Sequence, residues 1–145
     1  MIRLEKISKD NYRECLRLQV EECQMRFVSS NSASLAKAYV YYDDAIPLTV
    51  YNEDLMVGFI LLRYYDEEKS YLIDQFMIDT RYQGNGYGKQ AMELVIEQIK
   101  SERKYSKIIL CYIDGDEAAK RLYSGLGFYH TGEVDEDEII MRFDL

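Results

Sequence analysis

Three glycines alternate with other residues directly before a long segment of helical periodicity: Gly84, Gly86 and Gly88. Glycines in such a loop let backbone N–H groups approach a ligand closely, and the N-terminus of a helix favours an anion. Two common phosphate loops are excluded. A P-loop would need a glycine at Gln83 and Ser or Thr at Gln90, and a dinucleotide fingerprint would need a glycine at Lys89. A plain glycine turn between a strand and a helix stays open as an alternative.

Composition restricts the partners of such a loop. The chain has 145 residues and a net charge of -8, which fits one soluble domain over residues 1–145 and argues against a nucleic-acid ligand. A cationic ligand is compatible with this charge, although acidic proteins without one are common. The odd number of cysteines, with no CxxC pair, suggests neither a disulfide framework nor a zinc site, and we expect no metal. Without a long apolar run, we expect a cytoplasmic protein and no membrane.

The elements that must position the loop follow from hydrophobic periodicity. In the first part of the chain we expect strands over 2–7, 46–51, 55–65 and 70–78, and helices over 12–23 (capped by Ser8 or Asp10) and 32–39. After the loop we expect helices over 90–103 and 117–126, and strands over 107–113, 133–135 and 139–143. This βααβββαβαββ order predicts an α/β protein with a mixed sheet and helices on its faces.

Two sequence blocks carry a resemblance to a known family. The pattern Gln83-x-x-Gly86-x-Gly88, between a strand and a helix, resembles the acyl-CoA loop of the GCN5-related N-acetyltransferases (GNAT). The later block, Leu122-Tyr123-x-x-x-Gly127-Phe128, is similar to a second segment of that family. The resemblance covers nearly the whole chain. It implies the GNAT fold, with a central mixed, mostly antiparallel sheet of about seven strands, an acetyl-CoA-dependent N-acetyltransferase activity and a possible homodimer.

The resemblance also implies which residues hold acetyl-CoA. The strand before the loop would pair its main chain with the pantetheine, and the N–H of Met77 or Ile78 would polarise the thioester carbonyl. Asp116 stands where many relatives carry an asparagine, although a helix N-cap is the simpler interpretation of this residue. The full set of expected coenzyme A contacts is Phe76, Met77, Ile78, Gln83, Gly84, Asn85, Gly86, Tyr87, Gly88, Lys89, Asp116 and Tyr123.

Two side chains are candidates for proton transfer. Tyr123 matches the tyrosine that serves the family as general acid, although a core tyrosine is the alternative in a chain with fourteen tyrosines. Asp74 lies on the strand before the loop and is a possible base acting through a water. Strict alternation along that strand would place Asp74 and Phe76 on one face, and Gln75 and Met77 on the other. An ordinary carboxylate is a weak base for an ammonium, so Asp74 would need a water relay or a raised pKa.

The acceptor amine is not fixed by the fold. Acidic and aromatic side chains expected on the acceptor side suit a polyamine through charge-assisted hydrogen bonds and cation–π contacts: Glu21, Glu22, Tyr42 and Asp74. The segment from Asp74 to Gly86, with the Tyr41-Tyr42 pair, resembles the spermine/spermidine acetyltransferases of the family. Three alternatives stay open: a peptide N-terminus, an aminoglycoside amine, or a sensor that binds coenzyme A without turnover.

Overall fold

The computed structural model describes residues 1–145, which form one seven-stranded sheet with helices on both faces. The element order agrees with the prediction, and the mixed α/β architecture is confirmed. In chain order the elements are β1 (Ile2–Lys6), α1 (Tyr12–Arg17), α2 (Asn31–Val40), β2 (Ala45–Asn52), β3 (Leu55–Tyr65), β4 (Ser70–Ile78), α3 (Tyr87–Glu102), β5 (Lys107–Ile113), α4 (Glu117–Leu126), β6 (Tyr129–Asp135) and β7 (Glu138–Asp144). None of the helices is long and apolar enough to cross a membrane.

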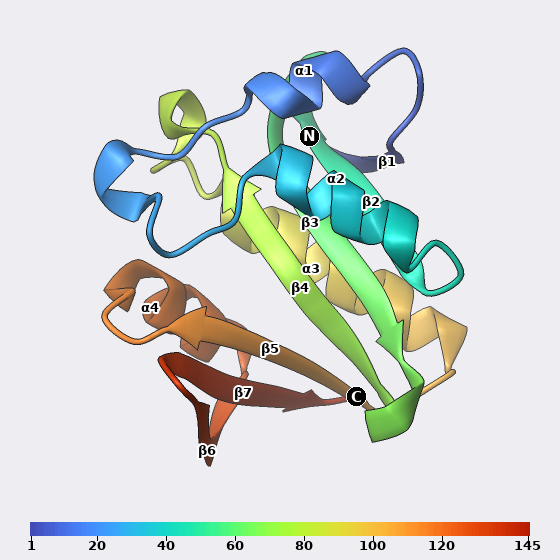
Figure 1. The fold of residues 1–145 in the computed structure, drawn as a ribbon, viewed down its shortest axis with the longest axis vertical. Helices are drawn as coiled ribbons and strands as arrows, with labels where there is room; N and C mark the ends of the chain where they lie inside the picture. Colours follow the sequence, from blue (N-terminus) through green and yellow to red (C-terminus); the bar gives the residue numbers. More distant parts are fainter.

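The sheet has the strand order β1-β2-β3-β4-β5-β7-β6, and β4–β5 is its one parallel neighbour pair. That parallel ladder is short, because it joins only Tyr71–Ile73 of β4 to Ile108–Leu110 of β5. Beyond it the two strands separate toward α4 (Figure 1). Beyond the ladder, β4 and β5 therefore each have one edge without a neighbouring strand, and the sheet is open in its middle.

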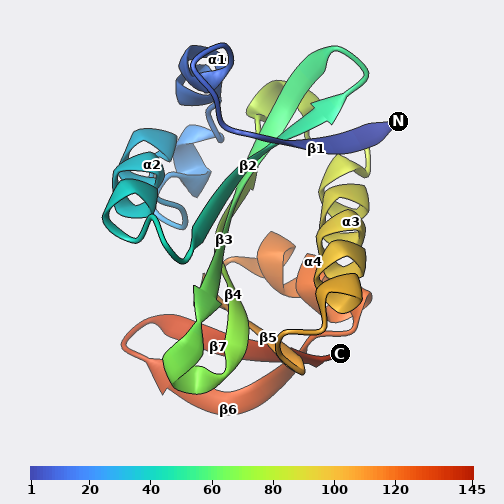
Figure 2. The same cartoon turned by 90° about the vertical axis from the view of Figure 1, so that its right-hand side faces the viewer.

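The helices form two layers around the sheet. The pair α3 and α4 covers one face, and the pair α1 and α2 covers the other (Figure 2). The larger core lies under α3, whose buried residues recur at helical spacing: Ala91, Met92, Val95, Ile96 and Ile99. Because α3 packs this stripe on the sheet, its N-terminus is fixed beside the end of β4.

The first helix is shorter than predicted. It ends at Arg17, and Leu18 is extended. The cause is a tertiary contact: the Gln19 N–H donates to Asp79 Oδ2 at 2.9 Å, and the Gln19 carbonyl accepts from the Thr80 N–H at 2.7 Å. These bonds fasten the segment after α1 to the segment after β4, so the helix cannot continue.

The capping residues of α1 and α4 can be compared with the predicted ones. The N-cap of α1 is Asn11, rather than Ser8 or Asp10. The Asp116 side chain accepts a hydrogen bond from the Ala119 N–H at 3.1 Å, which confirms Asp116 as the N-cap of α4. Gly127 ends α4 as expected, with a φ of 106° that favours glycine.

Candidate active site

The free edge of β4 presents main-chain groups to the opening in the sheet. The Asp79 N–H donates to the Val57 carbonyl on β3 at 2.8 Å. Because consecutive strand residues point their N–H groups to alternate edges, those of Ile78 and Phe76 point away from β3, toward the gap. The Ile78 carbonyl on this edge accepts from Gln83 Nε2 at 2.8 Å. Of the two predicted main-chain donors, the Ile78 N–H therefore faces the gap, whereas the Met77 N–H faces β3.

The glycine loop leaves backbone donors free at the start of α3. Gly84 and Gly86 have φ values of 82° and 79°, which only glycine adopts readily. The first helical hydrogen bond runs from the Gln90 N–H to the Gly86 carbonyl, so the N–H groups of residues 87–89 have no partner within the chain. The helix has no side-chain cap and no acidic residue in its first turn. This arrangement fits an anion such as a pyrophosphate.

Close packing fixes the loop against the strand. A Cβ added at Gly88 would lie 3.4 Å from Phe76 Cζ, so the first turn of α3 rests directly on β4. The Tyr87 hydroxyl accepts from Asn52 Nδ2 at 3.0 Å. The Asn85 side chain donates to the Tyr82 carbonyl at 2.9 Å, a bond within the loop.

A cleft of about 990 Å³ occupies the gap between β4 and β5 and continues toward α2. Most of the predicted site residues line it: Asp74, Phe76, Met77, Ile78, Gln83, Gly84, Gly86, Tyr87, Gly88, Lys89, Asp116 and Tyr123. Four others lie outside this lining: Glu21, Glu22, Tyr42 and Asn85. The structure therefore gathers the expected coenzyme A residues almost completely and separates the expected acceptor residues.

Tyr123 reaches the cleft from α4. Its side chain is 7% exposed, and its ring packs edge-on against Phe128 with the centroids 6.0 Å apart. Burial raises the pKa of the Tyr123 hydroxyl, and the Asp116 carboxylate raises it further. A tyrosine in this state keeps its proton at neutral pH, which a proton donor requires.

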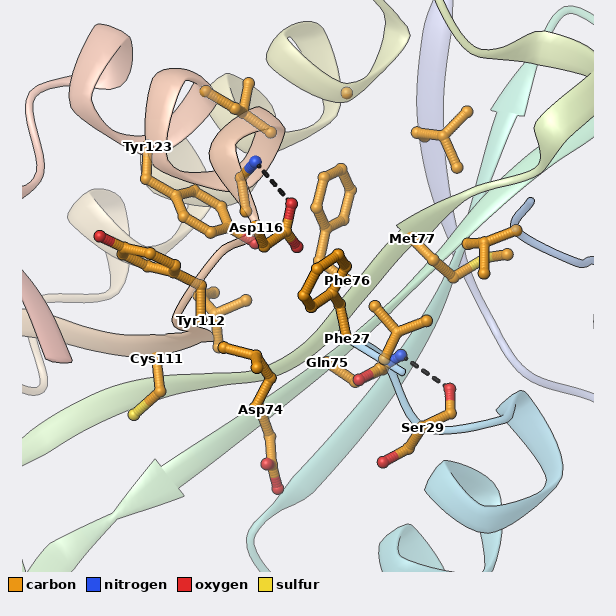
Figure 3. Close-up of a pocket in the computed structure, with 18 of the residues that line it drawn as sticks. Phe27, Ser29, Asp74, Gln75, Phe76, Met77, Cys111, Tyr112, Asp116 and Tyr123 are labelled. Carbon is orange, nitrogen blue, oxygen red and sulfur yellow. Dashed lines mark hydrogen bonds between the residues drawn. The ribbon is translucent and has the colours of Figure 1, made fainter. Parts of the chain in front are cut away.

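Asp74 lies on a β-bulge. Leu61 of β3 pairs with Gln75 and Leu62 pairs with Ile73, so Asp74 is the extra residue between them. The prediction that Asp74 shares a face with Phe76 is therefore wrong, whereas Gln75 and Met77 do share one face, on the side of α1 and α2. The Asp74 side chain points to the α2 side, where Lys37 Nζ lies 2.8 Å from its Oδ2. In the close-up its carboxylate points away from Tyr123 (Figure 3).

Phe76 and Gln75 show the effect of the bulge. The Phe76 ring contacts the α3 side at Gly88, on the opposite face from Asp74. Gln75 follows Asp74 on the α2 side, where its Nε2 donates to the Ser29 carbonyl at 2.9 Å (Figure 3). The bulge thus directs the Asp74 carboxylate to the α2 side of the sheet, whereas a regular strand would direct it to the α3 side with Phe76.

The predicted acceptor residues have other roles in the structure. Glu21 caps the short 3₁₀ helix Glu22–Gln24 and accepts from Thr80 Oγ1 at 2.9 Å. Tyr42 is 73% exposed and projects from the surface. Its neighbour Tyr41 lines the cleft instead, with its ring centroid 4.0 Å from the Arg63 guanidinium carbon. Glu21, Glu22 and Tyr42 therefore lie outside the cleft lining, and their substrate-binding role stays a prediction.

Several cleft residues were missed by the sequence analysis. Lys37 and Arg63 both contact Asp74, and the two charges are contributed by α2 and β3. Tyr112 hydrogen-bonds His130 Nε2 at 2.7 Å, so the one histidine of the chain supports a tyrosine of the cleft wall. Beside them, burial raises the pKa of the Cys111 thiol to about 11, which keeps this thiol protonated.

A mixed sheet that opens beside an uncapped helix N-terminus, with a buried tyrosine across the opening, defines the acyl-CoA N-acyltransferases. Comparison with known proteins agrees with this class. Residues 9–128 match the model of the acetyltransferase (GNAT) family, and the chain belongs to that family. It is accordingly an acetyl-CoA-dependent N-acetyltransferase, with acetyl-CoA as its co-substrate.

Individual relatives cover almost the whole chain. The spermine/spermidine N(1)-acetyltransferase of Bacillus subtilis (strain 168) is 33% identical over 142 residues, which span 92% of this chain and 91% of the relative. A spermidine N-acetyltransferase from Vibrio cholerae, solved with CoA and spermine, superposes with a TM-score of 0.80 at 17% identity, covering 99% of this chain and 95% of that one. An aminoglycoside acetyltransferase solved with coenzyme A gives 0.81 at 15% identity and the same coverage. These structures confirm the GNAT fold.

Proposed function

We propose that the protein transfers the acetyl group of acetyl-CoA to a primary amine of a polyamine such as spermidine or spermine. The observation that carries this proposal is the 33% identity to the Bacillus subtilis spermine/spermidine N(1)-acetyltransferase over 92% of the chain. The cleft supports it with several carboxylates in its lining: Glu67, Asp74, Asp116 and Glu138. Several spaced carboxylates suit a flexible ligand that carries several positive charges.

The coenzyme A half of the cleft supports a binding mode built on main-chain donors. The free N–H groups of residues 87–89 would bind the pyrophosphate, and the free edge of β4 would pair with the pantetheine. The Ile78 N–H would donate to the thioester oxygen, where negative charge develops during the reaction. Gly88 matters here because a larger side chain would fill space at the contact with Phe76.

The chemistry would be a direct transfer. The neutral acceptor amine attacks the thioester carbon, a C–N bond forms, and the C–S bond breaks. The Tyr123 hydroxyl would donate its proton to the departing thiolate. Asp74 would accept the amine proton through a water. Its Oδ1 is the atom for this role, because Oδ2 already contacts Arg63.

Thiol release from acetyl-CoA tests this proposal. Spermidine, spermine, a lysine peptide and an aminoglycoside should be compared as acceptors at equal concentration, with mass spectrometry of the products. We expect turnover with the two polyamines and little with the others. Turnover with the peptide or the aminoglycoside alone would show that the acceptor is that amine and not a polyamine. Binding of coenzyme A without release for any amine would instead support a sensor. A cytoplasmic location and a homodimer stay predictions.

A further inference from the structure

The charges around Asp74 differ from those of a simple ammonium-binding site. Two cations contact the same carboxylate oxygen: Lys37 Nζ at 2.8 Å and Arg63 Nη1 at 3.1 Å from Oδ2. Arg26 is a further cation in the cleft lining. An acceptor ammonium that binds Asp74 must therefore share or displace a positive charge that the protein already holds there.

The two cations on Asp74 are held very differently. The Arg63 side chain is 12% exposed, emerges from the central strand β3 and stacks on the Tyr41 ring. The Lys37 side chain is 44% exposed, emerges from α2 and has no recorded polar contact besides Asp74. Arg63 is therefore a fixed part of the wall, whereas Lys37 is held by one partly exposed ion pair, a weak kind of interaction.

Lys37 also resembles the ligand that we propose for the site. Its ε-ammonium is a primary ammonium on a four-carbon chain, with one charge and three hydrogen-bond donors. The end of a polyamine is a primary ammonium on a short alkyl chain with the same charge and donors. The two groups therefore compete for Asp74 on equal chemical terms, and only one of them fits the position 2.8 Å from Oδ2.

We propose that Lys37 occupies the acceptor ammonium site of the free enzyme and is displaced from Asp74 when a polyamine binds. This inference rests on the proposed polyamine acetylation. It makes Lys37 a specificity-determining residue that weakens the binding of cationic acceptors and sets the concentration at which they saturate the enzyme. Arg63 keeps Asp74 oriented during the exchange, because its own contact with Oδ2 does not depend on Lys37.

A graded series of substitutions tests the exchange. Lys37→Met removes the competing charge and keeps a good helix former in α2. We expect it to lower KM for spermidine, and its Kd by calorimetry, about threefold, which corresponds to one partly exposed ion pair. Lys37→Arg keeps the charge and should stay near the wild type. Lys37→Glu adds an anion and should lower KM more than Lys37→Met does. Lys100→Met is the matched control, since Lys100 is an exposed lysine of α3 outside the cleft.

The possible results separate this inference from the proposed function. If the wild type acetylates spermidine and Lys37→Met has the same KM, the role of Lys37 is overturned and the proposed function stands. A higher KM in Lys37→Met also overturns it, and would assign Lys37 to binding an acceptor that carries a carboxylate. If the wild type acetylates no polyamine, the proposed function fails. Calorimetry then decides the inference, and equal or absent spermidine binding in wild type and Lys37→Met overturns it.

Discussion

Replacing Tyr123 by phenylalanine tests the proposed proton donor with little disturbance of the fold. The change removes one oxygen and leaves the ring in its contact with Phe128, 6.0 Å between centroids. The structure records no hydrogen bond of the Tyr123 hydroxyl, so no partner is left unsatisfied. We therefore expect the free energy of unfolding to change by less than about 0.5 kcal/mol.

The effect on turnover should be much larger. A general acid typically contributes about 10²- to 10⁴-fold to the rate, or about 3–5 kcal/mol of barrier. Because Tyr123 is buried beside Asp116, which raises its pKa above the ordinary value, the wild-type acid stays protonated throughout the neutral and mildly alkaline range. Activity of the wild type should therefore show no loss from ionisation of Tyr123 below about pH 10.

The assay is thiol release from acetyl-CoA at saturating acceptor, together with the Kd of coenzyme A by calorimetry. We expect Tyr123→Phe to lower kcat at least about 100-fold while the Kd changes little. Tyr112→Phe is the matched control, since it removes a tyrosine hydroxyl from the same cleft wall. A kcat for Tyr123→Phe within about threefold of the wild type would refute the acid role.

Three further changes address the loop, the fold and the acceptor side. Gly88→Val should raise KM for acetyl-CoA about tenfold, because its side chain crowds Phe76 at the helix N-terminus; an unchanged KM would argue against this binding site. Asp79→Asn should lower the free energy of unfolding by about 1–3 kcal/mol at pH 7. Burial alone would raise the pKa of Asp79, but its hydrogen bonds outweigh burial and lower that pKa, so the stabilisation exists above the ordinary pKa and disappears as pH falls through the lowered one. Urea unfolding of the wild type and Asp79→Asn at pH 7 and at a pH below the lowered pKa of Asp79 checks this. An equal difference in the free energy of unfolding at the low pH would contradict it. Tyr41→Ala should raise KM for the acceptor because Tyr41 lines the cleft, whereas Tyr42→Ala should not, because Tyr42 lies on the outer surface. Equal effects of the two changes in acceptor titrations would show that Tyr41 is not part of the acceptor site.

The regular elements were predictable because their periodicity is local. The strands over 55–65, 70–78 and 107–113 and the helix over 117–126 have the bounds read from hydrophobic pattern and caps. The first helix was overextended because its end depends on Gln19 binding Asp79, far away in the sequence. A periodic pattern continues through Leu18, and nothing local signals the tertiary hydrogen bond that stops it.

The two halves of the site differed in how far the sequence described them. The coenzyme A half depends on backbone geometry after one strand, which the glycine spacing of Gly84, Gly86 and Gly88 encodes. The acceptor half depends on which side chains from separate elements meet in space. The bulge at Asp74 changes the direction of its side chain, and it arises from the register between β3 and β4 rather than from any local motif. For the same reason Lys37 was seen only as a helix residue.

The short parallel ladder between β4 and β5 also constrains how the chain folds. The antiparallel pairs β2–β3, β3–β4 and β6–β7 join strands that follow one another in the chain, so they form by local closure. Pairing of β4 with β5 requires residues 79–106 to form the crossover connection between these strands, and the ladder that results has only three residue pairs. We therefore expect two antiparallel units to form first and the packing of α3 on the sheet to join them late. The opening in the sheet is the part of this junction that stays unpaired.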